Sequence, residues 1–450
     1  MKIKNFLKIK KLSYFVSDPA LILLLFLYIY APEFSFLPFQ GLGLILPPST
    51  ILLYALSKNP KSITRFLFKN KIIVTFQFLL LALFLLALFL DIYGGSNNQV
   101  KFSIRYPIII ARFYFGALVS SVALYHLFDF SNKKMNGTNL ENLITSFFVI
   151  IFIQFVIVFI SLLNPSLRDF FNFQLLKPPA VMADEATFFY NRRGYGIASG
   201  YAFSYPLFNG FVMSLSLWSL ICTREKSKKI IYLICAAIAI IPIMLNARVG
   251  LIAIPCFFLS LFLIKPFNVG LTIKRVKLMF AILVLLNPLY ALIINYFNSS
   301  TIDWLLAGIE QFTLAFTLNF EEVRYLQGFS NEDYIPQNFL FGDGMYLFNN
   351  ENAYTTRSDI GYVNYFYFGG ILYSLLLYGT FAWFFIRVLL ESKAIKIKGV
   401  ILSTLIMFFI ANVKGMVFFD NELTRGFFLL LVFVVFDAKH RNQYQKFHSG

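Results

Sequence analysis

The sequence predicts an all-α polytopic membrane protein, on three observations. Hydrophobic residues make up 58% of the 450 residues, charged residues make up only 14%, and the mean hydropathy is +0.71. Soluble domains carry about 25% charged residues. Apolar stretches of roughly 17–25 residues, the length that spans a bilayer, recur along the whole chain. We therefore expect a single integral membrane domain over residues 1–450.

We interpret the apolar stretches as about twelve membrane spans. The basic start MKIKNFLKIKK resembles a signal peptide, but no small-x-small cleavage site follows it and further spans do, so we expect a retained first helix. The last two stretches are short. In chain order the expected spans lie near residues 13–31, 39–57, 72–91, 106–129, 142–163, 203–222, 230–246, 249–264, 278–296, 362–386, 400–413 and 426–437.

Lysine and arginine are distributed unevenly between the segments that connect these spans. With both termini in the cytoplasm, the inside segments contain 27 Lys and Arg residues and the outside segments contain 11, while Arg112 falls within a span. Cytoplasmic loops carry such an excess under the positive-inside rule. The formal net charge of +17 therefore indicates topology, and we expect no nucleic-acid partner.

Two long segments, about 164–202 and about 297–361, fall on the outside in this topology. Loops beyond roughly 15 residues are usually functional or disordered, and the aromatic content of these two argues against disorder. Apolar positions over 303–327 recur at helical spacing, which predicts an amphipathic helix. We expect function on the outer face.

Several kinds of site are not expected. The chain has no Walker A loop, dinucleotide fingerprint or HExxH motif. Its cysteines lie in or at the ends of apolar spans, and its histidines lie on the cytoplasmic side: Cys222, Cys235, Cys256, His126, His440 and His448. We expect neither a metal nor a cofactor on the outer face.

Arg248 lies in IPIMLNARVGLIAIP, between two apolar runs. The topology makes NARVG a tight hairpin at the outer boundary. A charge at the bilayer centre costs at least ~2.5–3.5 kcal/mol on insertion scales, and less near an interface. Arg248 is therefore either an anchor that snorkels to the headgroups or a ligand for an anionic substrate.

Other charged residues also allow two interpretations. The first long loop is basic and the second is acidic. Either the two loops simply attract each other, or they have different roles in one site. In the second case, arginines hold a polyanion and a carboxylate abstracts a proton. Arg112, seven residues after Arg105 and on the same helix face, and Lys414 either contribute to this site or snorkel outward. Asp359 either acts chemically or caps a helix that begins near Gly361.

Five fragments carry a family resemblance. NRRGYGIASGYAFSYP (191–206) ends the first loop, and NARVGL (246–251) forms the hairpin. VRYL (323–326) precedes FGDGMYLF (341–348), whose Gly342 and Gly344 are otherwise ordinary turn residues. TTRSDIGYVNYFYFGG (355–370) leads into a span. In order and sidedness they resemble the O-antigen polymerase (Wzy) family within the O-antigen ligase and polymerase superfamily, although Asn-Ala rather than Ser precedes Arg248.

The resemblance implies a metal-independent glycosyltransferase at the periplasmic face of a Gram-negative inner membrane. It would polymerise undecaprenyl-diphosphate-linked oligosaccharide repeat units, as donor and acceptor, into O-antigen or a related surface polysaccharide. Membrane lipids and a chain-length regulator are further expected partners. Arginine forks suit diphosphate oxygens and neutralise leaving-group charge.

On this resemblance, the catalytic candidates are Asp359 as base and Arg248 on the diphosphate. If Asp359 is not the base, Glu321 or Asp343 takes its place. The substrate-binding candidates are Arg192, Arg193, Arg324, Arg112, Lys414 and Arg357.

Two rival functions share parts of this pattern. The ligase family has the same architecture but relies on a histidine in its large outer loop, and this chain has none there. A lipid-linked oligosaccharide flippase also has about twelve spans, but its symmetric repeats and short outer loops do not match.

The topology predicts the outcome of reporter fusions. Fusions after Lys177 and Asn331 should report a periplasmic location, and fusions after Lys61 and Lys396 a cytoplasmic one, because of the positive-inside distribution. Paired alkaline phosphatase and fluorescent-protein reporters measure this. A cytoplasmic signal from either long loop contradicts the whole site assignment.

Overall fold

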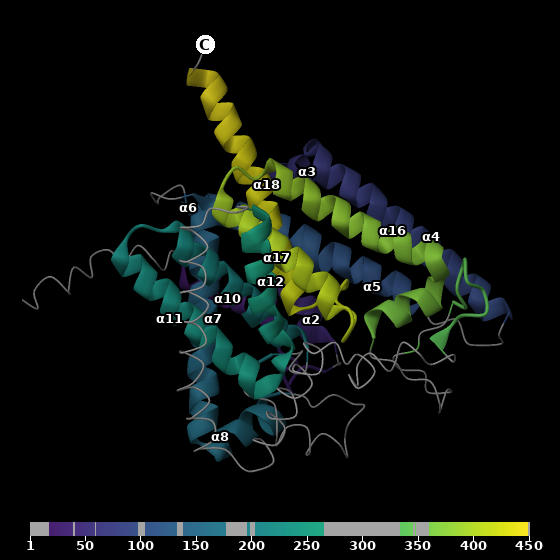
Figure 1. Ribbon diagram of the computed structural model, residues 1–450, viewed down its shortest axis with the longest axis horizontal. Coiled ribbons are helices and arrows are strands. Elements are labelled where there is room, and N and C mark those ends of the chain that lie inside the picture. Colours follow the sequence, from purple (N-terminus) through teal and green to yellow (C-terminus); the bar gives the residue numbers. More distant parts are fainter. Residues whose placement is uncertain are drawn as a thin grey trace, which may run out of the picture.

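The computed structural model of this chain is a bundle of helices (Figure 1). It describes residues 18–38, 41–58, 60–97, 104–132, 138–176, 196–198, 203–264, 334–344, 347 and 360–448. Within these ranges the one β pairing is an isolated antiparallel bridge between Phe34 and Leu176. The described part of the chain is therefore all-α, as predicted.

The structure describes seventeen helical elements. In chain order they are α1 (Pro19–Tyr30), α2 (Leu42–Lys58), α3 (Pro60–Lys69), α4 (Lys71–Asn97), α5 (Arg105–Phe113), the π-helix η3 (Tyr114–Val119), α6 (Ser120–Asn132), α7 (Asn139–Leu163), α8 (Pro165–Asp169), the π-helix η4 (Phe170–Leu175), α10 (Ser204–Cys222), α11 (Lys226–Asn246), the 3₁₀-helix η6 (Arg248–Ile252), α12 (Ala253–Ile264), α16 (Gly361–Glu391), α17 (Ile395–Ala411) and α18 (Glu422–His448).

Six described helical segments are long and apolar enough to cross a membrane: Lys71–Tyr93, Arg105–Ser131, Asn139–Leu163, Ser204–Cys222, Lys226–Asn246 and Gly361–Glu391. Three shorter helices, Pro19–Tyr30, Leu42–Lys58 and Val249–Ile264, are also apolar. Of the twelve predicted spans, 278–296 lies outside the described residues, and every other one overlaps a helix. A membrane-embedded helical protein is therefore supported, while the number twelve and the sidedness stay predictions.

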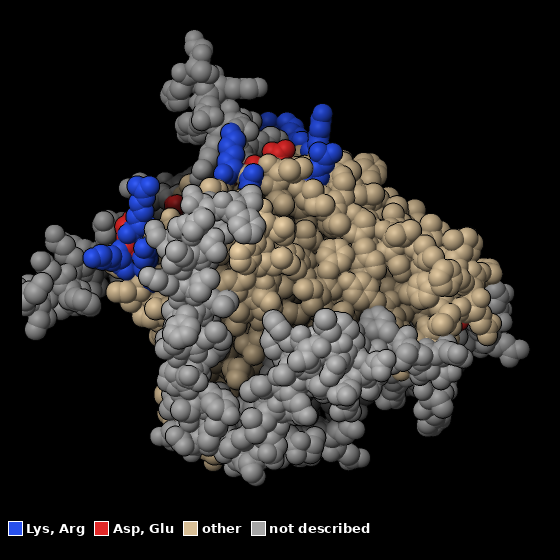
Figure 2. Space-filling model, in the orientation of Figure 1, with Lys and Arg blue, Asp and Glu red and all other residues tan. Residues whose placement is uncertain are grey.

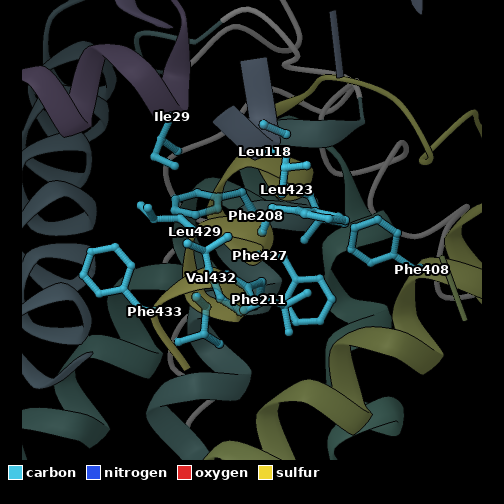
Figure 3. Close-up of a cluster of buried hydrophobic side chains, with 14 of the residues drawn as sticks. Ile29, Leu118, Phe208, Phe211, Phe408, Leu423, Phe427, Leu429, Val432 and Phe433 are labelled. Carbon is cyan, nitrogen blue, oxygen red and sulfur yellow. The ribbon is translucent and has the colours of Figure 1, made fainter. Parts of the chain in front are cut away.

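Helix α18 forms the centre of the bundle. Every residue from Glu422 to Phe436 is buried, as expected for a helix that is apolar all round. Figure 3 shows Phe427, Val432 and Phe433 of α18 among side chains from α1, η3, α10 and α17. The stretch that looked too short for a reliable span is thus enclosed by protein.

A buried ion pair fixes the start of α18. Arg425 is fully buried, and its guanidinium donates to both carboxylate oxygens of Asp420, each at 2.7 Å. It also donates to the backbone carbonyls of Tyr28 in α1 (2.7 Å) and Leu44 in α2 (2.9 Å). Arg425 falls between the expected spans 400–413 and 426–437, in a segment predicted to lie outside, and the structure instead buries it inside the protein.

Both of these carbonyls need a partner from outside their own helix. Tyr28 is in the last turn of α1, where carbonyls have no intrahelical donor. Leu44 is four residues before Pro48, which has no N–H to donate. Arg425 therefore completes the hydrogen bonding of two helix ends with one side chain.

The same contacts reach the π-helix η3. The Tyr28 hydroxyl donates to the Gly116 carbonyl at 2.8 Å. A Cβ atom at Gly116 would lie 2.6 Å from Oδ2 of Asp420, so only glycine allows the carboxylate to sit there. We call the set Tyr28, Leu44, Gly116, Asp420 and Arg425 the arginine clamp.

Basic side chains gather at one end of the bundle. On the face in Figure 2, Lys and Arg lie along the upper edge, above a broad band that shows neither. Figure 1 places α3 and the last turns of α18 at this end. A charged end and an apolar band suit a membrane-embedded bundle.

The clamp predicts that Gly116→Ala destabilises the protein, because the new methyl group meets a carboxylate that Arg425 holds in place. We expect a loss of about 1–3 kcal/mol, typical of overpacking, measured by thermal unfolding of the purified protein in detergent. Gly379→Ala in α16 is the matched control, because nothing lies within 4 Å of its Cβ position. Equal melting temperatures for both variants would show that the carboxylate moves freely.

Candidate functional site

Most of the predicted site residues lie outside the described residues. These are Arg192, Arg193, Glu321, Arg324, Arg357 and Asp359. The predicted amphipathic helix over 303–327 also lies outside them. The structure describes the backbone at Arg248 and both backbone and side chain at Arg112, Asp343 and Lys414.

Arg248 opens the turn that the sequence predicts. It is the first residue of η6, and only Ala247 separates it from the end of α11 at Asn246. The turn lies against the start of α10: a Cβ atom at Gly250 would be 2.2 Å from the Pro206 carbonyl oxygen, and one at Gly210 would be 2.5 Å from that of Gly250. The glycine two residues after Arg248 is therefore required by this close backbone approach.

The start of α10 also contacts the segment between α17 and α18. The Ser204 hydroxyl donates a short hydrogen bond to the carboxyl group of Glu422, and both side chains are buried. A Cβ atom at Gly415 would lie 2.9 Å from the ring of Phe203. The residues that directly follow the first long segment, 164–202, are thus tied to the segment that carries Lys414.

Lys414 lies in a tight turn after α17, where its backbone N–H donates to the Ala411 carbonyl at 2.9 Å. The start of α16 packs against the same segment. The Gly361 N–H donates to the Asn412 carbonyl at 2.9 Å, and a Cβ atom at Gly361 would lie 2.7 Å from the Gly415 carbonyl oxygen. Asp359 is two residues before Gly361 in the sequence, and the residue at the N-cap of α16 is Ile360.

Four parts of the chain therefore meet at one place, which we call the junction: Phe203–Pro206, Arg248–Gly250, Ile360–Gly361 and Asn412–Glu422. Each is in, or directly beside, a fragment that the sequence analysis singled out or one of its candidate residues. The junction joins the backbone at Arg248, the turn of Lys414 and the residues that follow Asp359.

Arg112 is connected to the junction along the chain, because its helix α5 continues into η3. It is half-buried in α5, four residues before Gly116 of the arginine clamp. Arg105 begins the same helix and is also half-buried. Among the described hydrogen bonds and ion pairs, none joins Arg112 to a junction residue.

Gly342 and Gly344 form a turn, as expected if they are ordinary turn residues. Both have left-handed backbone conformations, with φ of 69° and 68°. Asp343 accepts hydrogen bonds from the backbone N–H groups of Gln337 (3.2 Å) and Asn338 (3.3 Å). Its buried carboxylate therefore holds the turn together, which makes it a poor choice for a base.

This turn supports a break in α16 at Gly369 and Gly370. Carbonyls freed at the break, those of Tyr367 and Phe368, accept from the N–H groups of Asp343 and Gly344, both at 2.9 Å. Two freed N–H groups are satisfied in return: Ile371 donates to the Phe339 carbonyl at 3.1 Å, and Leu372 to the Leu340 carbonyl at 3.2 Å.

The polar residues at the start of α18 are not among the candidates predicted from the sequence. Asp420, Glu422 and Arg425 are all buried, and Asp420 is neutralised by Arg425. The signal was available in FFDNELTRGFF, where three charges within six residues interrupt an apolar stretch. Buried charges are paired or hydrogen-bonded, so such a cluster indicates a polar contact within the bundle.

Comparison with known proteins gives no family assignment. No protein-family model matches the chain, and no curated protein matches it. Among the described residues, no three His, Cys, Asp or Glu side chains are grouped so as to hold a metal ion.

The Ser204–Glu422 hydrogen bond predicts an order of stabilities. Glu422→Leu leaves the buried Ser204 hydroxyl without its acceptor, which should cost about 1–3 kcal/mol. Glu422→Gln keeps an acceptor oxygen of the same reach and should cost less. Thermal unfolding in detergent measures both, and Glu391→Leu, at an exposed acidic position of α16, is the control. Equal melting temperatures for Glu422→Leu and the wild type would contradict the assignment.

Proposed function

We propose that this chain is an O-antigen polymerase: it joins oligosaccharide repeat units carried on undecaprenyl diphosphate into a longer surface polysaccharide at the periplasmic face of a Gram-negative inner membrane. The observation that carries the proposal is the junction. Segments from four distant parts of the sequence, each in or beside a predicted motif or candidate residue, meet there. The start of α10 contacts Gly250 and the segment 412–422, and that segment contacts Gly361.

The proposed reaction transfers a glycosyl group. The acceptor hydroxyl oxygen bonds to the anomeric carbon of the donor sugar, the bond from that carbon to the diphosphate oxygen breaks, and undecaprenyl diphosphate leaves. A carboxylate takes the hydroxyl proton. Arg248, with Arg192, Arg193 and Arg324, would hold the diphosphate through charge-assisted hydrogen bonds. Arg357 and Lys414 would add positive charge.

The described contacts narrow the choice of base. Asp420 is paired with Arg425, and Asp343 is used by the turn of 337–344. Asp359 precedes the Gly361 that binds the Lys414 segment, so it remains our candidate. Arg112 is assigned to substrate binding on sequence grounds only, because no described hydrogen bond or ion pair joins it to the junction.

A deletion strain tests the function. Cells without this protein should carry a single repeat unit on the lipid A-core, because the flippase and ligase remain. Repeat units trapped on the cytoplasmic face would indicate a flippase instead. Lipid-linked polymer that never reaches the lipid A-core would indicate a ligase.

Complementation of that strain tests Arg248. Arg248→Lys keeps the charge and loses the bidentate fork, so we expect the long-chain ladder on a gel to fall by about tenfold or more. Arg387→Lys, at an exposed position of α16, is the matched control and should leave the ladder unchanged. A wild-type ladder from both Arg248→Lys and Arg248→Ala, at equal protein levels, would make Arg248 an anchor only.

A further inference from the structure

The short helix α3 carries a concentrated positive charge. The stretch KNPKSITRFLFKNK (58–71) contains five Lys or Arg residues and no Asp or Glu. Among the described residues, none of the five forms an ion pair. Cations at i, i+4 spacing on a helix repel one another, so this row of charge favours binding of an anion.

One face of α3 is fixed to the bundle. Ile63 and Leu67 are buried. The Phe66 ring packs edge-on against the His126 ring of α6, with centroids 4.3 Å apart, and against Phe436 of α18 at 4.7 Å. Because α3 is held by α6 and α18, its opposite face has a defined direction.

The opposite face combines cations with an exposed aromatic ring. Lys61, Arg65 and Lys69 are exposed at i, i+4 and i+8, which places them in one row along the helix. Phe68 is 69% exposed and, three residues after Arg65, lies beside that row. Basic residues next to an exposed large apolar side chain are typical of helices that lie in a membrane interface.

The neighbours of α3 place it where an apolar surface meets charge. It connects α2 to α4, whose exposed residues include Leu53 and Phe78, both 67% exposed. At the end of α2, Lys58 Nζ lies 5.3 Å from the ring centroid of Tyr54 and 5.6 Å from that of Phe130. Lys71 begins α4 and is exposed. Charged side chains thus extend the row at both ends of α3.

We propose that α3, with Lys58 and Lys71, binds the phosphate headgroups of anionic phospholipids, and that Phe68 enters the boundary between headgroups and acyl chains. The charge is complementary to that of an anionic leaflet, which attracts basic segments beside membrane helices. The apolar neighbours bring acyl chains next to the same surface. This inference does not depend on the proposed function, because α3 lies among the basic side chains at one end of the bundle and packs on α2, α4 and α6.

The test is lipid binding by the full-length protein in detergent, measured by native mass spectrometry with phosphatidylglycerol and with phosphatidylcholine of the same acyl chains. We expect phosphatidylglycerol to bind at least about tenfold more tightly. Each cation near an anionic surface contributes roughly fivefold in affinity, so Lys61→Gln/Arg65→Gln/Lys69→Gln should remove this preference.

The matched control is Lys226→Gln/Lys228→Gln/Lys229→Gln at the start of α11, which removes the same three exposed charges elsewhere. It should keep the preference. An equal loss in both triple variants would mean that only overall charge matters, and it would overturn the site on α3.

Two further measurements separate a lipid from a free anion. Phe68→Ser should weaken phosphatidylglycerol binding, because the lipid loses its apolar contact. Inorganic phosphate, added at the same concentrations, should not compete with the lipid. Full competition by phosphate, or unchanged lipid binding by Phe68→Ser, would overturn the proposal of a lipid-headgroup site.

Discussion

The packing of the bundle depends on one buried interaction, the pairing of Arg425 with Asp420. Its guanidinium also supplies the hydrogen bonds that the end of α1 and the proline-containing start of α2 cannot make themselves. A buried pair of this kind is weak evidence for net stability, but removal of one partner is strongly destabilising, about 3–5 kcal/mol. Its value here is specificity, since one side chain determines where three helix ends meet. Glycine at position 116 is part of the same arrangement, because it leaves room for the carboxylate.

The position of α18 explains why the junction forms where it does. Asn421 caps this helix by accepting a hydrogen bond from the Thr424 N–H at 3.0 Å, so the helix begins next to the arginine clamp. The segment before it must then return from the end of α17 alongside the starts of α10 and α16. The backbone carrying Lys414 is held by its neighbours on both sides, by Gly361 and by Phe203. In the function that we propose, this polar segment at a helix end would lie beside the charged group of the lipid-linked substrate.

The sequence predicted helix positions well, because long apolar runs with turn residues between them leave little choice of element. It also predicted the sharp turn at Arg248, from a single charge between two apolar runs. It did not predict which helix is central. FFLLLVFVVF of α18 is apolar on every side, and such a pattern is equally compatible with lipid and with protein neighbours. It also missed the contacts of Arg425, because its partners Tyr28 and Leu44 lie almost 400 residues away in sequence. Those contacts depend on tertiary packing, which no local pattern encodes.

The break in α16 has a mechanical consequence. The segment 339–344 replaces the missing helical hydrogen bonds at Gly369 and Gly370 with four of its own. The eight residues before the break, from Gly361 to Phe368, are joined to this segment on one side and to Asn412 on the other. If this half-helix rotated by itself, several backbone hydrogen bonds would break at once. We therefore expect the half-helix and the segment 339–344 to move together. A displacement of the segment 339–344 would therefore be passed through these hydrogen bonds to the start of α16 at Gly361.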